Sequence, residues 1–237
     1  PNWLKLLRKN PNIMIKKYDI ILPMPKNTHS CEYVIHAASI ASPTYYRLNP
    51  IKTMDANTIG LRNLLDYFLK QKKKNFLIKG FLYFSTSEIY GDPDKNNIPT
   101  PEPYKGNVSC IGPRACYDES KRFGETLCVN YAKEYKLPIK ITRPFNNYGP
   151  GLKITDKRAF PDFAKNIIKG DDIILFSNGK PTRTFCYIAD SIIGYYKVLI
   201  NGKNADPYNI GTDKEEISIA DLAKNSAEVA KKLFNYK

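Results

Sequence analysis

The chain has 237 residues, of which 42% are hydrophobic and 12% aromatic, so it can form a buried core and is not a disordered chain. We find no apolar run long enough to span a bilayer and no signal peptide at Pro1, which predicts a protein that is neither embedded in a membrane nor secreted. The formal net charge of +14 fits an anionic partner, such as nucleic acid or a diphosphate-bearing ligand, but it also fits a lysine-rich surface with no specific partner.

Strand and helix patterns alternate over the first 150 residues. Short strands rich in β-branched and aromatic residues are predicted at 33–38, 81–86 and 139–144. Apolar residues at helical spacing predict one helix over 53–69 and a longer one over 115–135. Strands that alternate with helices are typical of a parallel sheet covered on both faces.

Weaker patterns lie at the two ends of the chain. They predict a helix over 4–9, a strand over 13–15, a helix over 161–169, a strand over 173–176, a tight turn at 178–179 and a final helix over 219–233. Because Gly149-Pro150-Gly151 breaks the pattern, we expect a boundary near residue 150, with a smaller region over 151–237 whose elements interleave with the first.

The five cysteines are scattered and odd in number, and no two of them form a CxxC pair. This favours free thiols in the reducing cytosol over a disulfide framework or a structural zinc site. His29, Cys31 and His36 have a spacing that fits no common zinc signature. We therefore predict a cytoplasmic protein without a metal.

A dense basic run, Lys-Gln-Lys-Lys-Lys at 70–74, follows the first amphipathic helix. Cations stabilise the carboxyl end of a helix, and we favour that interpretation over a binding patch. A nucleic-acid interface needs basic and aromatic residues interleaved on one surface, whereas here only the net charge supports one. We therefore predict no nucleic-acid partner.

Tyr117 and Lys121 are four residues apart on the helix predicted over 115–135, so their side chains project from one face. Gly124 and Cys128 continue that face and are small enough to let the helix approach a sheet closely. A lysine beside a tyrosine stabilises the phenolate and lowers its pKa, which predicts a general base usable near neutral pH. The same spacing also arises by chance in a chain with 17 tyrosines.

Polar side chains gather where the predicted strands end. Ser85–Gly91 follows the second strand, Arg143–Pro150 follows the third, and Thr182–Asp190 adds a further arginine. Ligands of open α/β sheets bind at the carboxyl ends of the strands, so these segments predict a ligand site, although hydroxyl caps at a strand exit explain the first one equally well. The Arg183 fork suits a phosphate, and a surface salt bridge is the alternative.

Taken together and in this order, these segments resemble the extended short-chain dehydrogenase/reductase family, the group of nucleotide-sugar epimerases, dehydratases and decarboxylases. The resemblance runs from Asp19 to Ile219. It is carried further by the segments 36–43, 49–53 and 57–60 and, most specifically, by Ile111–Arg122. Within the family, the chain is most similar to the UDP-glucuronate decarboxylases.

The resemblance implies an α/β fold with a Rossmann-like, doubly wound parallel sheet that binds NAD, and a small carboxyl-terminal substrate-binding region. The family's amino-terminal strand and its GxxGxxG loop are missing from this sequence. Residues 1–150 would then form a partial NAD-binding Rossmann domain and residues 151–237 a partial nucleotide-sugar-binding region. Because that loop supplies backbone amides to the pyrophosphate, this chain alone is expected to bind NAD weakly or not at all.

The resemblance also implies roles for single residues. Tyr117 would be the catalytic base, Lys121 its partner that also holds the nicotinamide ribose, and Thr86 the hydroxyl that binds the sugar O4. The residues expected to contact NAD besides these are Asp19 and Ile20 at the adenine, Ala37, Ala38 and Ser39 along the cofactor, and Pro144 and Phe145 near the carboxamide. Those expected at the sugar-nucleotide diphosphate are Asn146, Arg183 and Arg158.

The pair Ser87-Glu88 points to the reaction. The 4,6-dehydratases of the family have Asp-Glu here, because an acid must protonate the departing C6 hydroxyl, and simple 4-epimerases usually lack the glutamate. Ser-Glu matches the decarboxylases, which implies conversion of UDP-glucuronate to UDP-xylose through a 4-keto intermediate. Ser87 or Glu88 would position the carboxylate or protonate the enolate. The alternatives are a 4,6-dehydratase or a 4-epimerase and, from other classes, an inactive fragment or a nucleic-acid-binding protein.

The resemblance finally implies a homodimer. Relatives pair the two helices that correspond here to 57–69 and 117–135. Phe123, Leu127 and Tyr131 form an apolar stripe that fits such a dimer, but packing inside the core explains it equally well.

Overall fold

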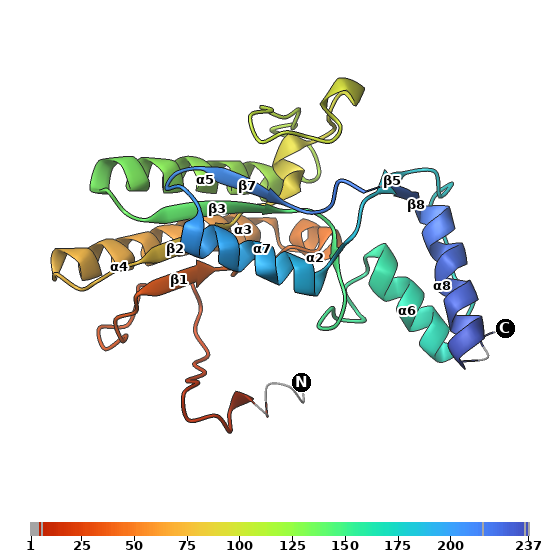
Figure 1. Cartoon of the computed structure of the whole chain (residues 1–237), viewed down its shortest axis with the longest axis horizontal. Coiled ribbons are helices and arrows are strands. Elements are labelled where there is room, and N and C mark those ends of the chain that lie inside the picture. The colour runs from red at the N-terminus through yellow and green to blue at the C-terminus, as the bar shows by residue number, and fades with distance from the viewer. Residues whose placement is uncertain (1–4, 6, 215, 235, 237) are drawn as a thin grey trace.

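The computed structural model describes residues 5, 7–214, 216–234 and 236 (Figure 1). Four parallel strands form its central sheet, in the spatial order β1 (Tyr33–His36), β2 (Gly80–Phe84), β3 (Ile139–Pro144) and β7 (Pro207–Ile210). Because the strands run parallel, their carboxyl ends share one edge of the sheet.

The two inner strands are buried on both faces, as is typical of a covered parallel sheet. The first four residues of β2 and the first five of β3 are buried. The edge strand β1 differs, because Tyr33 and Ile35 remain exposed.

One face of the sheet is covered by α4 (Leu61–Lys73) and α5 (Ala115–Tyr135) (Figure 1). Leu65 and Phe68 of α4 pack in one core cluster with Phe81 of β2. Each such side chain contributes roughly 2 kcal/mol when it is buried. Gly124 brings α5 close to β2, since a Cβ at this position would collide with the Tyr83 ring.

The helix predicted over 53–69 is three consecutive segments. They are α3 (Pro50–Asp55), the π-helical turn η1 (Ala56–Gly60) and α4. The wider turn carries Asn57, which is fully buried and whose Nδ2 donates to the Ser120 Oγ of α5 at 2.9 Å. The turn therefore joins this helical run to the helix that carries Tyr117.

The opposite face of the sheet is covered by α7 (Ile188–Asn201), where Val198 and Leu199 pack against Leu82. Helices on both faces make the sheet doubly wound, which confirms the predicted fold class. Both α7 and β7 follow residue 150 and yet belong to the sheet layer, so the two regions interleave. The division at residue 150 stays a prediction.

The remaining elements build the rim of the sheet and an outer region. They are α2 (Pro43–Leu48), the 3-10 turns η2 (Ser87–Tyr90) and η3 (Lys95–Asn97), β4 (Asn147–Tyr148) paired with β6 (Cys186–Tyr187), β5 (Thr182–Arg183) paired with β8 (Ile217–Ser218), α6 (Ala159–Lys169) and α8 (Ile219–Phe234). Phe163 of α6 packs against Leu222 and Ala223 of α8. Figure 1 shows this helix pair to one side of the sheet, where the chain arrives from β7.

Several predicted bounds change. The first strand ends at His36, two residues early, and no strand forms over 13–15 or 173–176. Residues 13–15 are exposed and pair with no strand of the described chain, whereas Ile173 and Leu175 are half-buried against the α6–α8 cluster without joining a ladder. The helix predicted over 4–9 lies partly outside the described residues.

The helix predicted over 115–135 is confirmed with the same bounds. Within the described part of the chain, no helix is long and apolar enough to cross a bilayer.

Candidate active site

Helix α5 presents Tyr117 and Lys121 to the carboxyl end of β2. Both side chains are buried, at 6% and 2% exposure. The Lys121 Nζ donates to the Phe84 carbonyl oxygen at 2.6 Å and lies 5.8 Å from the centre of the Tyr117 ring. The two side chains therefore lie on one side of the helix, as their spacing predicts.

The Tyr117 side chain has one aromatic neighbour, Tyr46, and one hydroxyl neighbour, Thr86. Its ring stacks on Tyr46 of α2, with the ring centres 5.0 Å apart and the planes 7° from parallel. Thr86, at the end of β2, is its hydrogen-bonding neighbour, and the Thr86 Oγ1 also accepts from the Glu88 backbone N–H at 3.3 Å. These contacts fix the phenol between α2 and the strand end.

Burial dominates the electrostatics of this pair. It raises the pKa of Tyr117 to about 12, although the Thr86 hydrogen bond opposes the change, and it lowers the pKa of Lys121 to about 7. The expectation of a lowered phenol pKa is therefore wrong for the protein in this state. Desolvation outweighs the neighbouring amine, which donates to a backbone carbonyl instead of the phenol.

His36, at the end of β1, is a buried neighbour of Lys121 that the sequence analysis does not place among the site residues. It is 1% exposed, and its ring lies 5.7 Å from the ring of Tyr83. Burial first and the charge of Lys121 second lower its pKa to about 4, so it is neutral at physiological pH.

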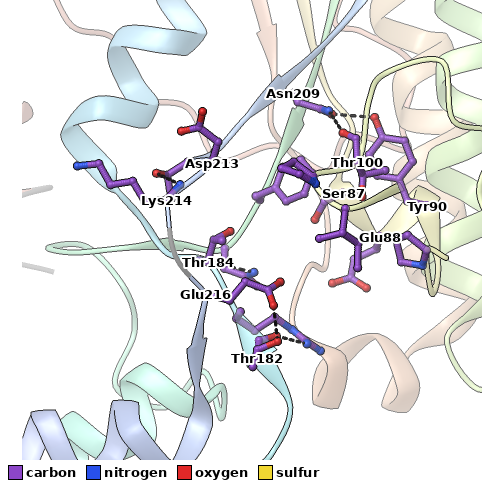
Figure 2. Close-up of a pocket in the computed structure, with 18 of the residues that line it drawn as sticks. Ser87, Glu88, Tyr90, Thr100, Thr182, Thr184, Asn209, Asp213, Lys214 and Glu216 are labelled. Atoms are coloured by element: carbon purple, nitrogen blue, oxygen red, sulfur yellow. Dashed lines mark hydrogen bonds between the residues drawn. The ribbon is translucent and has the colours of Figure 1, made fainter. Parts of the chain in front are cut away.

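A cavity of about 590 Å³ begins at Ser87, the residue after Thr86, and neither Thr86 nor the buried pair of Tyr117 and Lys121 lines it. Five of the predicted site residues line it, namely Ser87, Glu88, Phe145, Asn146 and Arg183. Figure 2 shows that the other wall comes from the segment after β7, with Asp213, Lys214 and Glu216, and from Thr182 and Thr184. The cavity therefore lies between the sheet edge and the outer region.

A buried network supports the floor of the cavity. The Arg143 guanidinium donates to both carboxylate oxygens of Glu125, at 2.9 and 2.6 Å, and to the Tyr90 hydroxyl at 2.7 Å. The Tyr90 hydroxyl in turn donates to the Asn209 Oδ1 at 2.8 Å (Figure 2). The network ties the ends of β3 and β7 to the turn that carries Ser87 and Glu88.

Glu88 forms an ion pair with Arg114, the residue that precedes α5. The Arg114 Nε also lies 3.5 Å from the Asp118 carboxylate, whose pKa is raised by burial against the effect of Arg114. Arg114 lies inside the most specific motif of the sequence, Ile111–Arg122. The sequence nevertheless does not predict its ion pair with Glu88, because a contact between residues 26 positions apart leaves no periodic pattern. Tyr46 was missed for the same reason, because the sequence does not show which helices stack.

Comparison with known proteins agrees with this geometry. A family model described as the NAD dependent epimerase/dehydratase family matches residues 21–211. The chain belongs to that family. It is 36% identical over 220 residues to UDP-glucuronic acid decarboxylase 5 of Arabidopsis thaliana, an alignment that covers 93% of this chain and 61% of that relative. The chain thus spans less than two thirds of that relative's length.

Two solved structures show the same fold over most of the chain. UDP-glucose 4-epimerase of Thermotoga maritima, solved with UDP-glucose, gives a TM-score of 0.74 at 27% identity, over 87% of this chain and 62% of that one. The Bordetella bronchiseptica enzyme WbmF, solved with NAD+ and UDP, gives 0.69 at 26% identity, over 85% of this chain and 58% of that one.

Of the residues predicted to bind the cofactor, only Phe145 lines the cavity. Those that follow or end β1 and β3 lie at the carboxyl edge of the sheet, whereas Ile20 lies against Gly60 of η1. Ala37 and Ala38 are exposed just after β1, with the half-buried Ser39 next to them, and Pro144 ends β3 opposite Ile210. Asp19 is exposed, and the Ile20 carbonyl accepts from the Asn63 amide at 3.2 Å.

The two arginines predicted at the diphosphate are tied locally. The Arg158 Nε bonds to the Asp156 carboxylate at 2.6 Å, and Arg158 lies outside the cavity, although its charge lowers the Tyr117 pKa slightly against burial. Arg183 lines the cavity, is exposed, and donates to the Thr182 carbonyl at 2.6 Å. The structure therefore brings Arg183, but not Arg158, to the cavity.

Proposed function

We propose that the protein to which this chain belongs is an NAD-dependent decarboxylase that converts UDP-glucuronate to UDP-xylose and carbon dioxide. The observation that carries the proposal is that Thr86, the neighbour of the buried Tyr117–Lys121 pair, is followed directly by Ser87 and Glu88, which line the cavity. The name of the Arabidopsis relative supports the same reaction.

The strand ends fit a polar ligand such as NAD. Three residues there carry buried polar side-chain atoms with no hydrogen-bond partner among the described residues, namely both ring nitrogens of His36 and the hydroxyls of Ser39 and Ser85. Such atoms are costly to leave unpaired. Lys121, Tyr117, Ala37–Ser39 and Pro144–Phe145 would hold the cofactor, with Asp19 and Ile20 at its adenine. NAD, when bound, supplies the hydride acceptor and donor for C4 of the sugar.

The side chains of the chain handle the protons of the reaction. Burial holds Tyr117 as a neutral phenol, so the phenol must lose its own proton before it can take the proton of the C4 hydroxyl. Thr86 orients that hydroxyl while the hydrogen on C4 leaves as hydride. The resulting 4-keto uronate is a β-keto acid, so its C5–C6 bond breaks, carbon dioxide leaves and the electron pair remains as an enolate. The enolate takes a proton from water at C5, the hydride returns to C4, and Tyr117 returns its proton to the C4 oxygen.

Ser87 and Glu88 favour decarboxylation over dehydration of the sugar. Ser87 has no acidic proton to give to a C6 hydroxyl, which disfavours dehydration. Glu88 accepts a hydrogen bond from Arg114, and a guanidinium is only a donor, so this pairing supports Glu88 as a positioning group rather than the acid that protonates C5. A 4,6-dehydratase or a 4-epimerase of the same family remains the alternative.

Turnover of UDP-glucuronate tests the proposal. The protein is expressed with any residues that its own reading frame encodes before Pro1, and is then supplied with UDP-glucuronate and NAD+. We expect carbon dioxide and a UDP-pentose, and a loss of at least about 100-fold in kcat for Tyr117→Phe, which removes only the hydroxyl.

Tyr196→Phe, on the exposed face of α7, is the matched control and keeps its activity. Conversion of UDP-glucose or a dTDP-hexose without carbon dioxide would show that the Ser87 argument is wrong.

We also propose a cytosolic homodimer that pairs the faces of α4 and α5. The predicted stripe divides in the structure, because Tyr131 is buried and donates to the Asp66 carboxylate at 2.5 Å, whereas Phe123 is 52% exposed. Ile59, on the adjoining turn η1, is also exposed. Phe123 and Ile59 thus support an interface, and sedimentation equilibrium measures its stoichiometry.

A further inference from the structure

A second cavity, of about 290 Å³, lies between the segment 23–30 and the carboxyl-terminal half of α4. It shares no residue with the cavity beside Thr86, nor with the residues proposed to hold NAD or the sugar nucleotide. Its wall contains part of the basic run at 70–74, which the sequence predicts to stabilise the carboxyl end of a helix.

That position is confirmed, because Lys70, Lys72 and Lys73 lie in the last turn of α4, but within the described part of the chain only Lys72 of this run bonds to carbonyl oxygens at a helix end. The Lys72 Nζ donates to the carbonyl oxygens of Tyr135 and Lys136, at 2.8 and 2.9 Å, which places it at the end of the neighbouring α5 rather than its own helix. Lys70 and Lys74 are one helical turn apart and both line the cavity. Lys26 lines it from the segment 23–30, so three lysines line one hollow.

The acidic residue of the cavity wall is already engaged. One oxygen of the Asp66 carboxylate accepts from the Arg62 Nε at 3.0 Å and the other from the Tyr131 hydroxyl at 2.5 Å. Its charge is therefore balanced outside the cavity, and the three lysines give the hollow a net positive potential.

Gln71, between the two lysines, supplies the observation that points to a ligand. Its side chain is 3% exposed, and its Oε1 accepts from the Cys31 backbone N–H at 2.7 Å, which fixes the orientation of the amide. Its Nε2 is buried and has no hydrogen-bond partner among the residues that the structure describes. The Cys31 thiol nearby is at most a weak acceptor, so a donor in a cationic wall lacks a strong acceptor.

We propose that this cavity binds the phosphate or pyrophosphate group of a small ligand, at a site separate from the proposed active site. Phosphate oxygens accept from both the lysine ammonium groups and the Gln71 amide, and charge-assisted hydrogen bonds of this kind are strong. A concave hollow favours a small ligand over a nucleic acid, which needs a continuous surface with stacking aromatic side chains. Tyr67 lines the hollow, but its hydroxyl is bonded to the His29 carbonyl.

The test follows backbone amide NMR signals of residues 28–31 and 66–74 during titration with inorganic pyrophosphate. We expect saturable shifts, and Lys70→Gln or Lys74→Gln weakens binding about tenfold or more. Lys73→Gln removes the same charge from an exposed position of α4 outside the cavity, so it changes the affinity less than about twofold. Equal weakening by all three variants would show a diffuse charge effect and overturn the proposal.

A second variant tests the amide itself. Gln71→Glu keeps an oxygen for the Cys31 N–H but replaces the Nε2 donor with an anionic oxygen, so we expect pyrophosphate binding to be lost while thermal unfolding shows that the variant is folded. If Gln71→Glu does not fold, Gln71→Met is titrated with pyrophosphate beside the lysine variants. Weaker binding by Gln71→Met supports the contact between the Gln71 amide and the phosphate, and unchanged affinity argues against it.

Two further arms identify the source of the phosphate group. ADP that binds no tighter than pyrophosphate indicates that the phosphates alone are recognised, whereas much tighter binding of ADP indicates a nucleotide ligand. Both results support the site. A single-stranded oligonucleotide that binds tighter than either, with equal loss in Lys73→Gln, would replace the proposal with a nucleic-acid surface.

Discussion

The buried and the open ends of the proposed active site are held in different ways. Tyr117 and Lys121 are almost inaccessible and have fixed partners from the sheet and α2. Glu88 and Arg183 are partly or fully exposed, and Arg183 rests on the carbonyl of its own neighbour. The fold therefore fixes the buried end, with Tyr117 and Lys121, before any ligand binds, and the burial of these polar groups costs desolvation energy. The open end, with Glu88 and Arg183, costs little desolvation energy and can adjust to the substrate.

The largest effect should come from the buried lysine. Its pKa is about 7 in the folded state and 10.5 for an ordinary lysine, so between these values the unfolded chain holds a proton that the folded chain has lost. The Lys121 contribution to stability therefore rises with pH across this window, by on the order of 5 kcal/mol. We expect Lys121→Met to remove that rise.

Urea denaturation between pH 7 and 10.5 measures this contribution as the difference between the parent protein and the variant. The difference is needed because burial raises the pKa of Cys128, and a thiol with a raised pKa makes stability fall with increasing pH. Lys133→Met, an exposed position on the same helix, is the control and leaves the difference flat. If the unfolding free energies of the parent protein and Lys121→Met changed in parallel with pH, the Lys121 ammonium would have to be hydrated in the folded protein.

Gly91 tests whether the open end depends on a fixed backbone. It ends the turn that carries Ser87 and Glu88, has φ of +64°, and a Cβ there would collide with the Asn107 carbonyl. We expect Gly91→Ala to cost about 3 kcal/mol or more in unfolding free energy, because strain and steric overlap add.

Gly170 is the matched control for that substitution. It ends α6 with φ of +74°, and no atom lies within 4 Å of where its Cβ would be. Gly170→Ala therefore costs only the left-handed backbone penalty, about 1 kcal/mol. Thermal or urea unfolding measures both free energies. Equal losses of unfolding free energy for Gly91→Ala and Gly170→Ala would show that the backbone of the turn beside Glu88 can shift as easily as an exposed helix end.

The smallest effect on stability should come from Arg183. Because its side chain is exposed, Arg183→Gln should change the unfolding free energy by less than about 0.5 kcal/mol, yet weaken UDP binding about tenfold through the lost contact to phosphate. Calorimetric titration with UDP measures the second quantity, with Arg47→Gln as an exposed control outside the cavity. A large loss of stability would place Arg183 in the fixed part of the site.

The sequence predicts those features that depend on local periodicity or on the direction of parallel strands. The inner strands, the bounds of α5, the shared face of Tyr117 and Lys121 and the gathering of Ser87, Glu88 and Asn146 at one edge are of this kind. Strands of two residues, such as β5 and β8, are missed because two residues have no periodicity.

Contacts between distant segments account for the other differences. The stacking of Tyr46 on Tyr117 and the pairing of Glu88 with Arg114 depend on how whole helices pack. The pKa of Tyr117 was predicted in the wrong direction because the sequence shows a neighbouring charge but not the depth of burial, and burial has the larger effect here.

The π-helical turn over Ala56–Gly60 has a consequence for how this gene can change. The buried Asn57 amide bridges from this turn to Ser120, three residues from the proposed base. Losing a single codon here would tighten the coil and rotate the following apolar residues by about 100° relative to that bridge, so Leu61 and Leu65 would turn away from the core. This stretch should therefore accept many replacements of its exposed side chains, but no insertion or deletion.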